Sequence, residues 1–298
     1  MEHDREKVKN ILIIGEGSYI GEALYKWLKR YPEQYSVDIV SPKEGKWRER
    51  DFRKYPTVID LAGIAHINHI TEDMRDLFYS VNRDLTAEIG GYAKENGVKH
   101  FLYFSSMNVY GDSCYVVNDR NAERPTSFYG DSKLQGDMEL RKLEDKKFVV
   151  AYIRPPFVYG RGCRGNYQKI SKIARRTPVF PDYQNKKSMI YIDNLCEFVR
   201  LVIEEGRGGI LTPQNKELVS TAYLVKTIAE VNNHKIKMTK SINWMVKIAA
   251  KRIRAAGRAF ADDCYNRELS DYYGFRYCVV DFKESIYKTE TSKEGLLH

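Results

Sequence analysis

The sequence predicts an α/β protein whose core is a parallel sheet with helices on both faces. Three observations predict it. Short apolar runs alternate with helical patterns through the first 155 residues, a glycine-rich turn follows the first run, and 43% of the 298 residues are hydrophobic. Such alternation is typical of parallel sheets, and a chain of this length can bury a large core.

Five apolar runs are expected to be strands, because each is short and bounded by polar or turn residues. The first run, KNILIIG, ends in Gly15. The other four are Ser36–Ser41, Thr57–Leu61, Val98–Ser106 and Lys147–Pro155.

Helical patterns lie between these runs. Leu24, Trp27 and Leu28 recur at the i, i+3, i+4 spacing of one helix face. Helices are expected at Tyr19–Arg30, Thr71–Asn96 and Tyr129–Leu143. Five strand–helix units in sequence predict a Rossmann-type, doubly wound sheet.

The pattern changes after residue 155, where prolines and glycines mark loops between shorter helices. These helices are expected at Tyr167–Arg176, Asn194–Glu205 and Thr221–Asn232. We therefore expect a dinucleotide-binding domain over residues 1–155 and a smaller, mostly helical substrate-binding region over residues 156–298. The second region is expected to interleave with the first at the sheet edge, where open α/β folds bind their ligands.

Charge and cysteine content limit the function classes. Lysine and arginine outnumber aspartate and glutamate by 49 to 40, a net charge of +9. A basic excess suits nucleic acid, an anionic membrane surface or a phosphorylated small substrate, and charge alone does not choose among them. The five cysteines form no CxxC pair, which argues against a disulfide framework or a structural zinc site. With no apolar stretch of roughly 20 residues and no secretory signal, the cytoplasm is the expected compartment.

The glycine-rich turn predicts a dinucleotide site. Glycines there permit a tight turn and let backbone amides approach a pyrophosphate at the helix N-terminus. The turn consists of Gly15, Glu16, Gly17, Ser18, Tyr19, Ile20 and Gly21. An acidic residue at the end of the second strand would favour NAD, but Ser41 holds that place and Lys43 is close by, so NADP stays open.

Three residues have the chemistry of a proton-transfer set. Ser106 ends the fourth strand, and Tyr129 and Lys133 are four residues apart at the start of a helix. That spacing places the phenol and the ammonium on one helix face. A nearby ammonium lowers the pKa of a phenol, and the resulting phenolate can accept a proton from a sugar hydroxyl as hydride leaves the same carbon.

In these residues the chain resembles the extended short-chain dehydrogenases/reductases, and within them the NAD-dependent epimerase/dehydratase family. Matching segments follow in order along nearly the whole chain. Besides the glycine turn and the Tyr129–Lys133 pair, they are Asp51-Phe52, Leu61-Ala62-Gly63, Val81-Asn82, Phe104 to Gly111, Arg154 to Gly160 and Tyr191 to Leu195.

The resemblance implies a role for each matching residue. Tyr129 would be the general base, Lys133 would orient it and bind the nicotinamide ribose, and Ser106 would assist at the substrate hydroxyl. NAD would also contact Gly15, Gly17, Ser18, Tyr19, Ile20, Gly21, Ser41, Asp51, Phe52, Leu61, Ala62, Gly63, Asn82 and Pro155. A homodimer is a further expectation from the resemblance.

The chain departs from the family pattern at two places that bear on the reaction. Dehydratases of the family carry an Asp-Glu pair directly after the serine, where this chain has Met107 and Asn108, so dehydration is not expected. Phe157 stands where many epimerases place an asparagine that helps to hold the substrate diphosphate. Contacts to the substrate are expected from Ser106, Arg161, Asn166 and Lys187.

The segment Ile242–Phe260 combines an apolar stripe with several cations. Such a helix can lie on an anionic membrane, but packing of the stripe against the protein is commoner and is expected here. The stripe is Ile242, Met245, Val246, Ala249, Ile253 and Ala256, and the cations are Lys247, Lys251, Arg252, Arg254 and Arg258.

These features favour an NAD-dependent nucleotide-sugar epimerase that inverts C4 of a UDP-hexose through a 4-keto intermediate. The alternative enzyme is an NADPH-dependent reductase of a 4-keto nucleotide sugar. An alternative of another class is a non-enzymatic protein that senses dinucleotides or binds polyanions, and the Ser106, Tyr129 and Lys133 set argues against it. No nucleic-acid partner and no metal are expected.

Overall fold

A computed structural model of the chain describes residues 8–65, 74–111, 116–118 and 122–291. The chain forms two compact units. The first contains residues 1–111, 122–155 and 195–213, and the second contains residues 112–121, 156–194 and 214–298. The chain therefore leaves the first unit after Pro155 and re-enters it for one later helix and strand.

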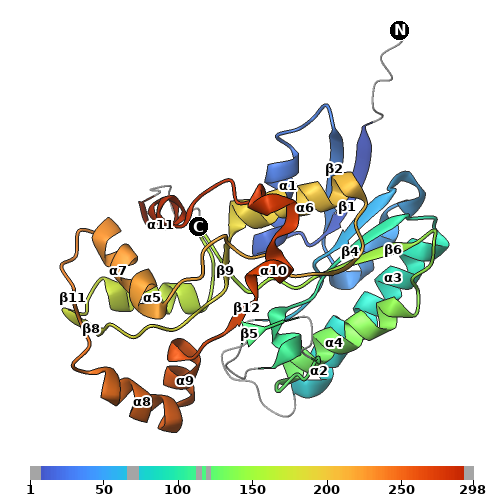
Figure 1. The fold of residues 1–298 in the computed structure, drawn as a ribbon. Coiled ribbons are helices and arrows are strands. Elements are labelled where there is room, and N and C mark those ends of the chain that lie inside the picture. Colours follow the sequence, from blue (N-terminus) through green and yellow to red (C-terminus); the bar gives the residue numbers. More distant parts are fainter. Residues whose placement is uncertain (1–7, 66–73, 112–115, 119–121, 292–298) are drawn as a thin grey trace. The chain divides into compact units, whose positions relative to one another are not determined.

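The first unit is built on a six-stranded sheet in the order β10-β6-β4-β3-β1-β2, in which every neighbouring pair is parallel (Figure 1). The strands are β1 (Lys9–Ile14), β2 (Tyr35–Val40), β3 (Thr57–Asp60), β4 (His100–Phe104), β6 (Val149–Ile153) and β10 (Gly209–Leu211). In the register, Ile11 lies between Val37 and Thr57. The expected Rossmann-type fold class is confirmed, with β10 as a sixth strand that the sequence did not indicate.

Helices cover both faces of this sheet, with α1 and α6 on one side and α3 and α4 on the other (Figure 1). Their bounds are α1 (Tyr19–Leu28), α2 (Arg75–Tyr79), α3 (Thr86–Glu95), α4 (Phe128–Arg141) and α6 (Ile192–Glu205), together with the short 3₁₀ helices η1 (Lys43–Glu49), η2 (Phe52–Lys54) and η5 (Met107–Tyr110). Trp47 and Phe52 are fully buried and pack edge-on against Tyr92.

The helix expected at Thr71–Asn96 differs from the prediction. Its start at residues 71–73 lies outside the described residues. The remainder is α2, then the π-helical segment η4 (Ser80–Leu85), then α3. Single π turns within α-helices often occur at functional sites, and this one contains the buried Asn82.

The second unit is mostly helical, with small two-stranded pairs. Its helices are α5 (Asn166–Ala174), α7 (Thr221–Val231), α8 (Asn243–Arg252), α9 (Arg254–Phe260), α10 (Arg267–Ser270), η6 (Tyr272–Phe275) and α11 (Phe282–Thr291). Its strands are β5 (Val116–Val117), β7 (Phe157–Tyr159), β8 (Val179–Pro181), β9 (Met189–Tyr191), β11 (Lys237–Thr239) and β12 (Cys264–Tyr265). Glu290 joins three helices, because it accepts hydrogen bonds from Tyr167 (2.9 Å), Ser171 (3.1 Å) and Asn232 (2.9 Å).

The basic segment Ile242–Phe260 is not one continuous helix. The backbone at Ile253 is extended (φ −120°, ψ 109°), and this residue ends α8 and precedes α9. The apolar stripe is therefore interrupted, since its members no longer lie on one helix. Val246 is buried, whereas Met245 and Ile253 are exposed, so the expectation that the whole stripe packs on the protein is wrong.

Candidate active site

The glycine-rich turn joins β1 to α1 in the first unit. Gly17 has a φ of +77°, which favours glycine. A Cβ at Gly21 would lie 2.3 Å from the Gly15 carbonyl oxygen, so this position also requires glycine. Ser18 caps α1, because its Oγ accepts a hydrogen bond from the Gly21 amide (3.0 Å) and donates one to the Gly15 carbonyl (2.6 Å). The Ser18 side chain thus stabilises this tight turn.

Glu22 is a residue near the turn that sequence reasoning did not select. Its Oε1 accepts a hydrogen bond from the Gly17 amide (3.0 Å). Tyr19 and Ile20, the first residues of α1, are half-buried beside it. An anion that approaches the Gly17 amide must share that amide with the Glu22 carboxylate or displace it.

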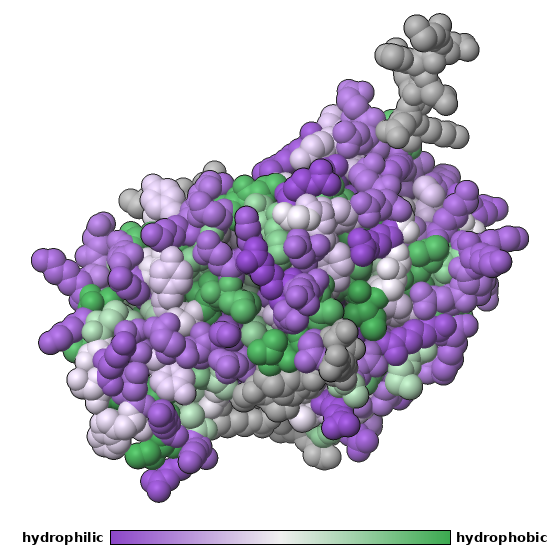
Figure 2. Space-filling view, in the orientation of Figure 1, coloured by the Kyte–Doolittle hydropathy of each residue, from purple (hydrophilic) through white to green (hydrophobic). Residues whose placement is uncertain are grey.

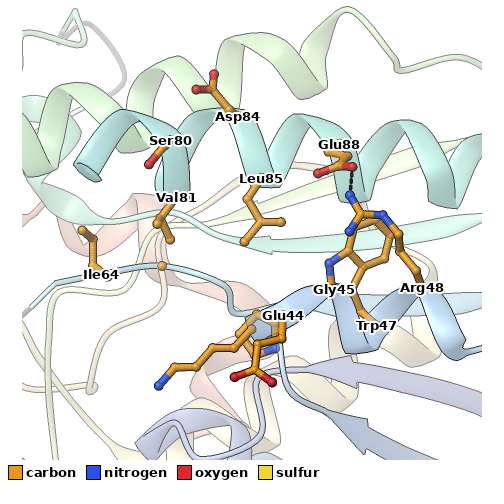
Figure 3. Close-up of a pocket in the computed structure, with 13 residues that line it drawn as sticks. Glu44, Gly45, Trp47, Arg48, Ile64, Ser80, Val81, Asp84, Leu85 and Glu88 are labelled. Carbon is orange, nitrogen blue, oxygen red and sulfur yellow. Dashed lines mark hydrogen bonds and ion pairs between the residues drawn. The ribbon is translucent and has the colours of Figure 1, made fainter. Parts of the chain in front are cut away.

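A pocket of about 570 Å³ lies between η1, the loop after β3 and the η4–α3 helix. Figure 3 shows Val81 and Leu85 pointing from η4 towards the Glu44–Gly45 turn, and Arg48 paired with Glu88. The lining includes two cations, Lys43 and Arg48, and three carboxylates, those of Glu44, Asp84 and Glu88.

Three predicted cofactor residues that follow β2 in the chain differ in the groups that they have available to contact a ligand. Ser41 follows β2, and its Oγ accepts a hydrogen bond from the Lys43 amide (3.2 Å). Asp51 caps η2 and pairs with Arg53 (2.8 Å), which holds the pKa of that carboxyl below its usual value. The Phe52 ring is fully buried, so only the backbone of Phe52 is available for a contact.

The loop after β3 is held by Asn82. The Asn82 Oδ1 accepts a hydrogen bond from the Ile64 amide (2.9 Å), and its Nδ2 donates to Ser132 Oγ (3.0 Å). Leu61 and Ala62 precede Gly63, where a Cβ would lie 2.8 Å from Lys133 Nζ. A side chain at residue 63 would therefore displace the Lys133 ammonium and press on Asn82 Oδ1, which would lie 3.0 Å away.

The structure brings Ser106, Tyr129 and Lys133 together in the first unit. Ser127 caps α4 by accepting a hydrogen bond from the Gly130 amide (3.2 Å), which places Tyr129 in the first turn of the helix. Tyr129 is half-buried, and its phenol lies close enough to the Ser106 side chain to interact with it. Desolvation raises the pKa of Tyr129, and the interaction with Ser106 acts in the opposite direction. The pKa shift is thus opposite to the lowering that the sequence suggested.

Lys133 is almost completely buried, and its ammonium is satisfied by the backbone. Its Nζ donates hydrogen bonds to the carbonyl oxygens of Ala62 (3.2 Å) and Phe104 (2.9 Å). Burial lowers the pKa of Lys133 to about 8. In the described structure the ammonium therefore lies at the loop after β3, beside the carboxyl end of β4.

Asp60 is a charged residue of this region that sequence reasoning missed. It ends β3, is fully buried, and accepts a hydrogen bond from the Ala62 amide (2.8 Å). Burial raises the pKa of Asp60 to about 7, and its charge in turn raises the pKa of Lys133 against the effect of burial. Asp60 and Lys133 thus bind the N–H and the C=O of the same residue, Ala62. The sequence feature that could have identified Asp60 is an aspartate at the end of an otherwise apolar strand.

A second buried ion cluster involves α4. The Arg154 side chain is fully buried and forms ion pairs with Asp137 and Glu123, and it donates a hydrogen bond to the Tyr110 hydroxyl (2.8 Å). Arg154 precedes Pro155, whose carbonyl accepts a hydrogen bond from the Met107 amide (3.2 Å). The cluster therefore connects α4 to the segment that follows Ser106.

Apart from Ser106, the residues predicted to contact the substrate all belong to the second unit. Asn166 is the exposed first residue of α5, and Arg161 is exposed in the loop before it. Lys187 donates a hydrogen bond to the Arg258 carbonyl (2.6 Å) and lies 3.8 Å from Asp263. Their relation to Ser106 and Tyr129 stays a prediction, and Lys187 has a structural role within its own unit.

A family model described as "NAD dependent epimerase/dehydratase family" matches residues 11–212. The match covers more than half of the chain, including the glycine turn and the Ser106, Tyr129 and Lys133 set. The chain belongs to this family, and the resemblance seen in the sequence is confirmed.

Two curated relatives are similar in sequence to most of this chain. The chain is 28% identical over 254 residues to a UDP-glucose 4-epimerase of Vibrio cholerae, covering 76% of each chain. It is 26% identical over 246 residues to an N-acetyl-α-D-glucosaminyl-diphospho-ditrans,octacis-undecaprenol 4-epimerase of Escherichia coli O157:H7, covering 76% of this chain and 73% of that one.

Solved structures share the fold at low sequence identity. A Thermus thermophilus UDP-glucose 4-epimerase in complex with NAD aligns with a TM-score of 0.69 and 17% identity, over 94% of this chain and 97% of that one. A dTDP-4-dehydrorhamnose reductase from Clostridium acetobutylicum aligns with a TM-score of 0.70 and 17% identity, over 94% and 98%. Both an epimerase and a reductase therefore share the architecture, and the fold alone does not separate the two reactions.

Proposed function

We propose that this protein is an NAD-dependent epimerase that inverts C4 of a UDP-hexose. The observation that carries the proposal is the contact between Ser106 and Tyr129, with Lys133 one turn further along α4, in the unit that also carries the glycine turn. Two curated relatives named as 4-epimerases support the reaction type.

The residues present fit a dinucleotide. The Gly15–Gly21 turn leaves open space at Gly17, where no atom lies within 4 Å of a Cβ position, and the pocket along η1 has room for the adenosine end. NAD would be held there by the turn, Ser41, Asp51, the Phe52 backbone and the Leu61–Gly63 loop. When bound, NAD supplies the acceptor for a hydride.

The side chains of the first unit then manage the proton. Tyr129 Oη takes the proton of the C4 hydroxyl as the C4–H bond breaks, and Ser106 Oγ holds the same oxygen. Lys133, which is positively charged below its pKa of about 8, favours the phenolate of Tyr129. Epimerisation requires the 4-keto sugar to present its opposite face; hydride would then return to C4 from that side while Tyr129 returns the proton to the C4 oxygen, so no net oxidation would occur.

The charge of the pocket supports NAD over NADP. Three carboxylates and two cations line it, and one of those cations, Arg48, is paired with Glu88. Such a balance provides little attraction for an additional 2′-phosphate. We also propose contacts to the substrate diphosphate from Asn166, Arg161 and Lys187. Phe157 stands where many epimerases have an asparagine for this diphosphate, so the family pattern does not specify which group carries it.

A second candidate is an NADPH-dependent reductase of a 4-keto nucleotide sugar. The specific observation in its favour is that Ser41 provides no carboxylate after β2, while Lys43 is exposed in the same pocket. Dehydration is not proposed, because Met107 and Asn108 bear no acid or base. A purely sensing or polyanion-binding role would not require the Ser106–Tyr129 contact.

The test combines the cofactor content with the product. Freshly purified protein is denatured and the released nucleotide is identified by mass spectrometry, and native protein is incubated with UDP-glucose and UDP-N-acetylglucosamine while NMR follows the configuration at C4. Near-stoichiometric NAD and a C4 epimer are expected. Protein without nucleotide that consumes NADPH with a 4-keto nucleotide sugar would instead establish the reductase.

A further inference from the structure

The positive charge of the chain is concentrated in one segment of the second unit. Residues 231–261 contain five lysines and three arginines and no aspartate or glutamate. These eight cations are comparable to the net charge of +9 of the whole chain. The segment includes α8 and α9, and its charge is not used by the proposed reaction.

The outward face of α8 is apolar as well as basic. Trp244 is 60% exposed, Met245 52% and Ile248 45%, whereas Val246 on the opposite side is only 7% exposed. Trp244 and Ile248 are four residues apart and so share one face of the helix. The other two tryptophans of the chain, Trp27 and Trp47, are buried.

Cations flank these apolar side chains. Lys247, Lys251 and Arg252 are exposed on the same helix. Lys251 follows Trp244 by seven residues, which places it on the face of Trp244 and Ile248. The lower left of the surface in Figure 2, over α8 and α9, accordingly carries hydrophobic and hydrophilic residues side by side.

We propose that the outward face of α8 docks the protein on an anionic lipid surface. Indole and aliphatic side chains enter the boundary between headgroups and acyl chains, while the neighbouring cations bind lipid phosphates. In the described part of the chain, no helix is long and apolar enough to cross a bilayer, so attachment takes place at the surface.

The charge pattern favours lipid over the other possible occupants. A two-fold interface with a second copy through α8 would bring two basic faces together, and like charges oppose such pairing. Nucleic acid would satisfy the cations but not an isoleucine and a methionine that are about half exposed. Docking depends on the surface of α8 and not on the proposed reaction.

The experiment uses the full chain in flotation with vesicles of phosphatidylcholine, with and without phosphatidylglycerol. Binding is expected only to the anionic vesicles and should weaken as salt is raised. The emission of Trp244 is expected to shift to the blue on binding, because its indole leaves water. Absence of binding to anionic vesicles would overturn the proposal.

Variants distinguish docking through α8 from non-specific binding to vesicles. Trp244→Ser with Ile248→Ser, and Lys247→Glu with Lys251→Glu, are each expected to lower vesicle binding by at least about tenfold. The matched controls are Tyr287→Ser and Lys283→Glu, which change exposed residues on α11 and should bind as the unaltered chain does. Equal binding by all variants, or a dimer in lipid-free solution that only the α8 variants dissociate, would contradict the proposal.

Discussion

Tyr129 is the residue on which the proposed chemistry depends. Its phenol contacts Ser106, and desolvation keeps the pKa of Tyr129 above its ordinary value of 10.0. Desolvation therefore disfavours the phenolate that the proposed proton transfer requires, and a nearby positive charge must offset it. The nearest source of charge on its own helix face is Lys133, which is buried against the loop after β3.

Tyr129→Phe removes the proton acceptor and keeps the ring. We expect kcat to fall roughly 10²- to 10⁴-fold, while the nucleotide content of the purified protein stays the same. Steady-state kinetics and mass spectrometry of the released nucleotide measure the two quantities. Tyr287→Phe, which changes an exposed side chain of α11, is the control. A Tyr129→Phe enzyme with unaltered kcat would show that another group transfers the proton.

Asp60→Asn tests the charge beside Lys133. Asp60 raises the pKa of Lys133, which burial has lowered to about 8. Removing this carboxylate should lower that pKa further, so the ammonium deprotonates at a lower pH and the alkaline limb of kcat/KM moves to lower pH. The control is Asp38→Asn, which removes a carboxylate bonded to Tyr55 (2.7 Å). An alkaline limb that does not move would exclude the coupling.

At the scale of elements, two glycines have contrasting surroundings. A Cβ at Gly63 would lie 2.8 Å from the flexible end of Lys133 and 3.0 Å from Asn82 Oδ1, whereas a Cβ at Gly91 in α3 would meet nothing within 4 Å. The Gly63 change should therefore act on the ammonium and on the Asn82 amide that holds this loop, while the rest of the fold is kept.

Gly63→Ala is expected to lower kcat roughly 10- to 100-fold, since it displaces a positioned group, with little change in Tm. Gly91→Ala should leave kcat unchanged and stabilise the protein by about 0.5–1 kcal/mol, because alanine is favoured over glycine inside a helix. Thermal unfolding and kinetics on the same samples distinguish the two effects. A Gly63→Ala protein with a much lower Tm, whose folded fraction keeps the kcat of the unaltered chain, would contradict this account.

Local patterns were sufficient to predict most elements. The apolar spacing of α1, α4, α5 and α7 lies within each helix, so their bounds were predicted to within a few residues. The π-helical segment η4 and the extended residue Ile253 were missed, because hydrophobic periodicity does not register a single changed turn. Strand β10 was missed because it has three residues, two of them exposed.

The sequence predicted those site residues whose chemical type and whose place at a strand end or helix start both fit a known pattern. Ser106, Tyr129 and Lys133 follow a strand end and begin a helix, and the structure brings them together. Asp60 and the Arg154–Asp137 pair were not assigned, since their meaning depends on burial and on partners that are distant in sequence. The direction of the Tyr129 pKa shift was wrong for the same reason, because desolvation is a property of the folded chain.

At the scale of the whole molecule, the residues of the two proposals lie in different units. The first contains the glycine turn, the pocket along η1 and the proton-transfer residues, and the second contains the basic face of α8. Because the residues of the proposed reaction and the proposed docking face lie in separate units, variants of α8 should leave turnover of a water-soluble UDP-hexose intact, and Tyr129→Phe should leave vesicle binding intact.

The central claim is that hydride leaves C4 and returns to the same carbon. The most direct measurement follows deuterium in the UDP-hexose that the enzyme turns over, labelled at C4 and analysed by NMR and mass spectrometry. The account predicts an epimer that keeps its deuterium at C4, with none transferred to water. Loss of the label to solvent, or its appearance in a released reduced nucleotide, would contradict the proposed epimerase.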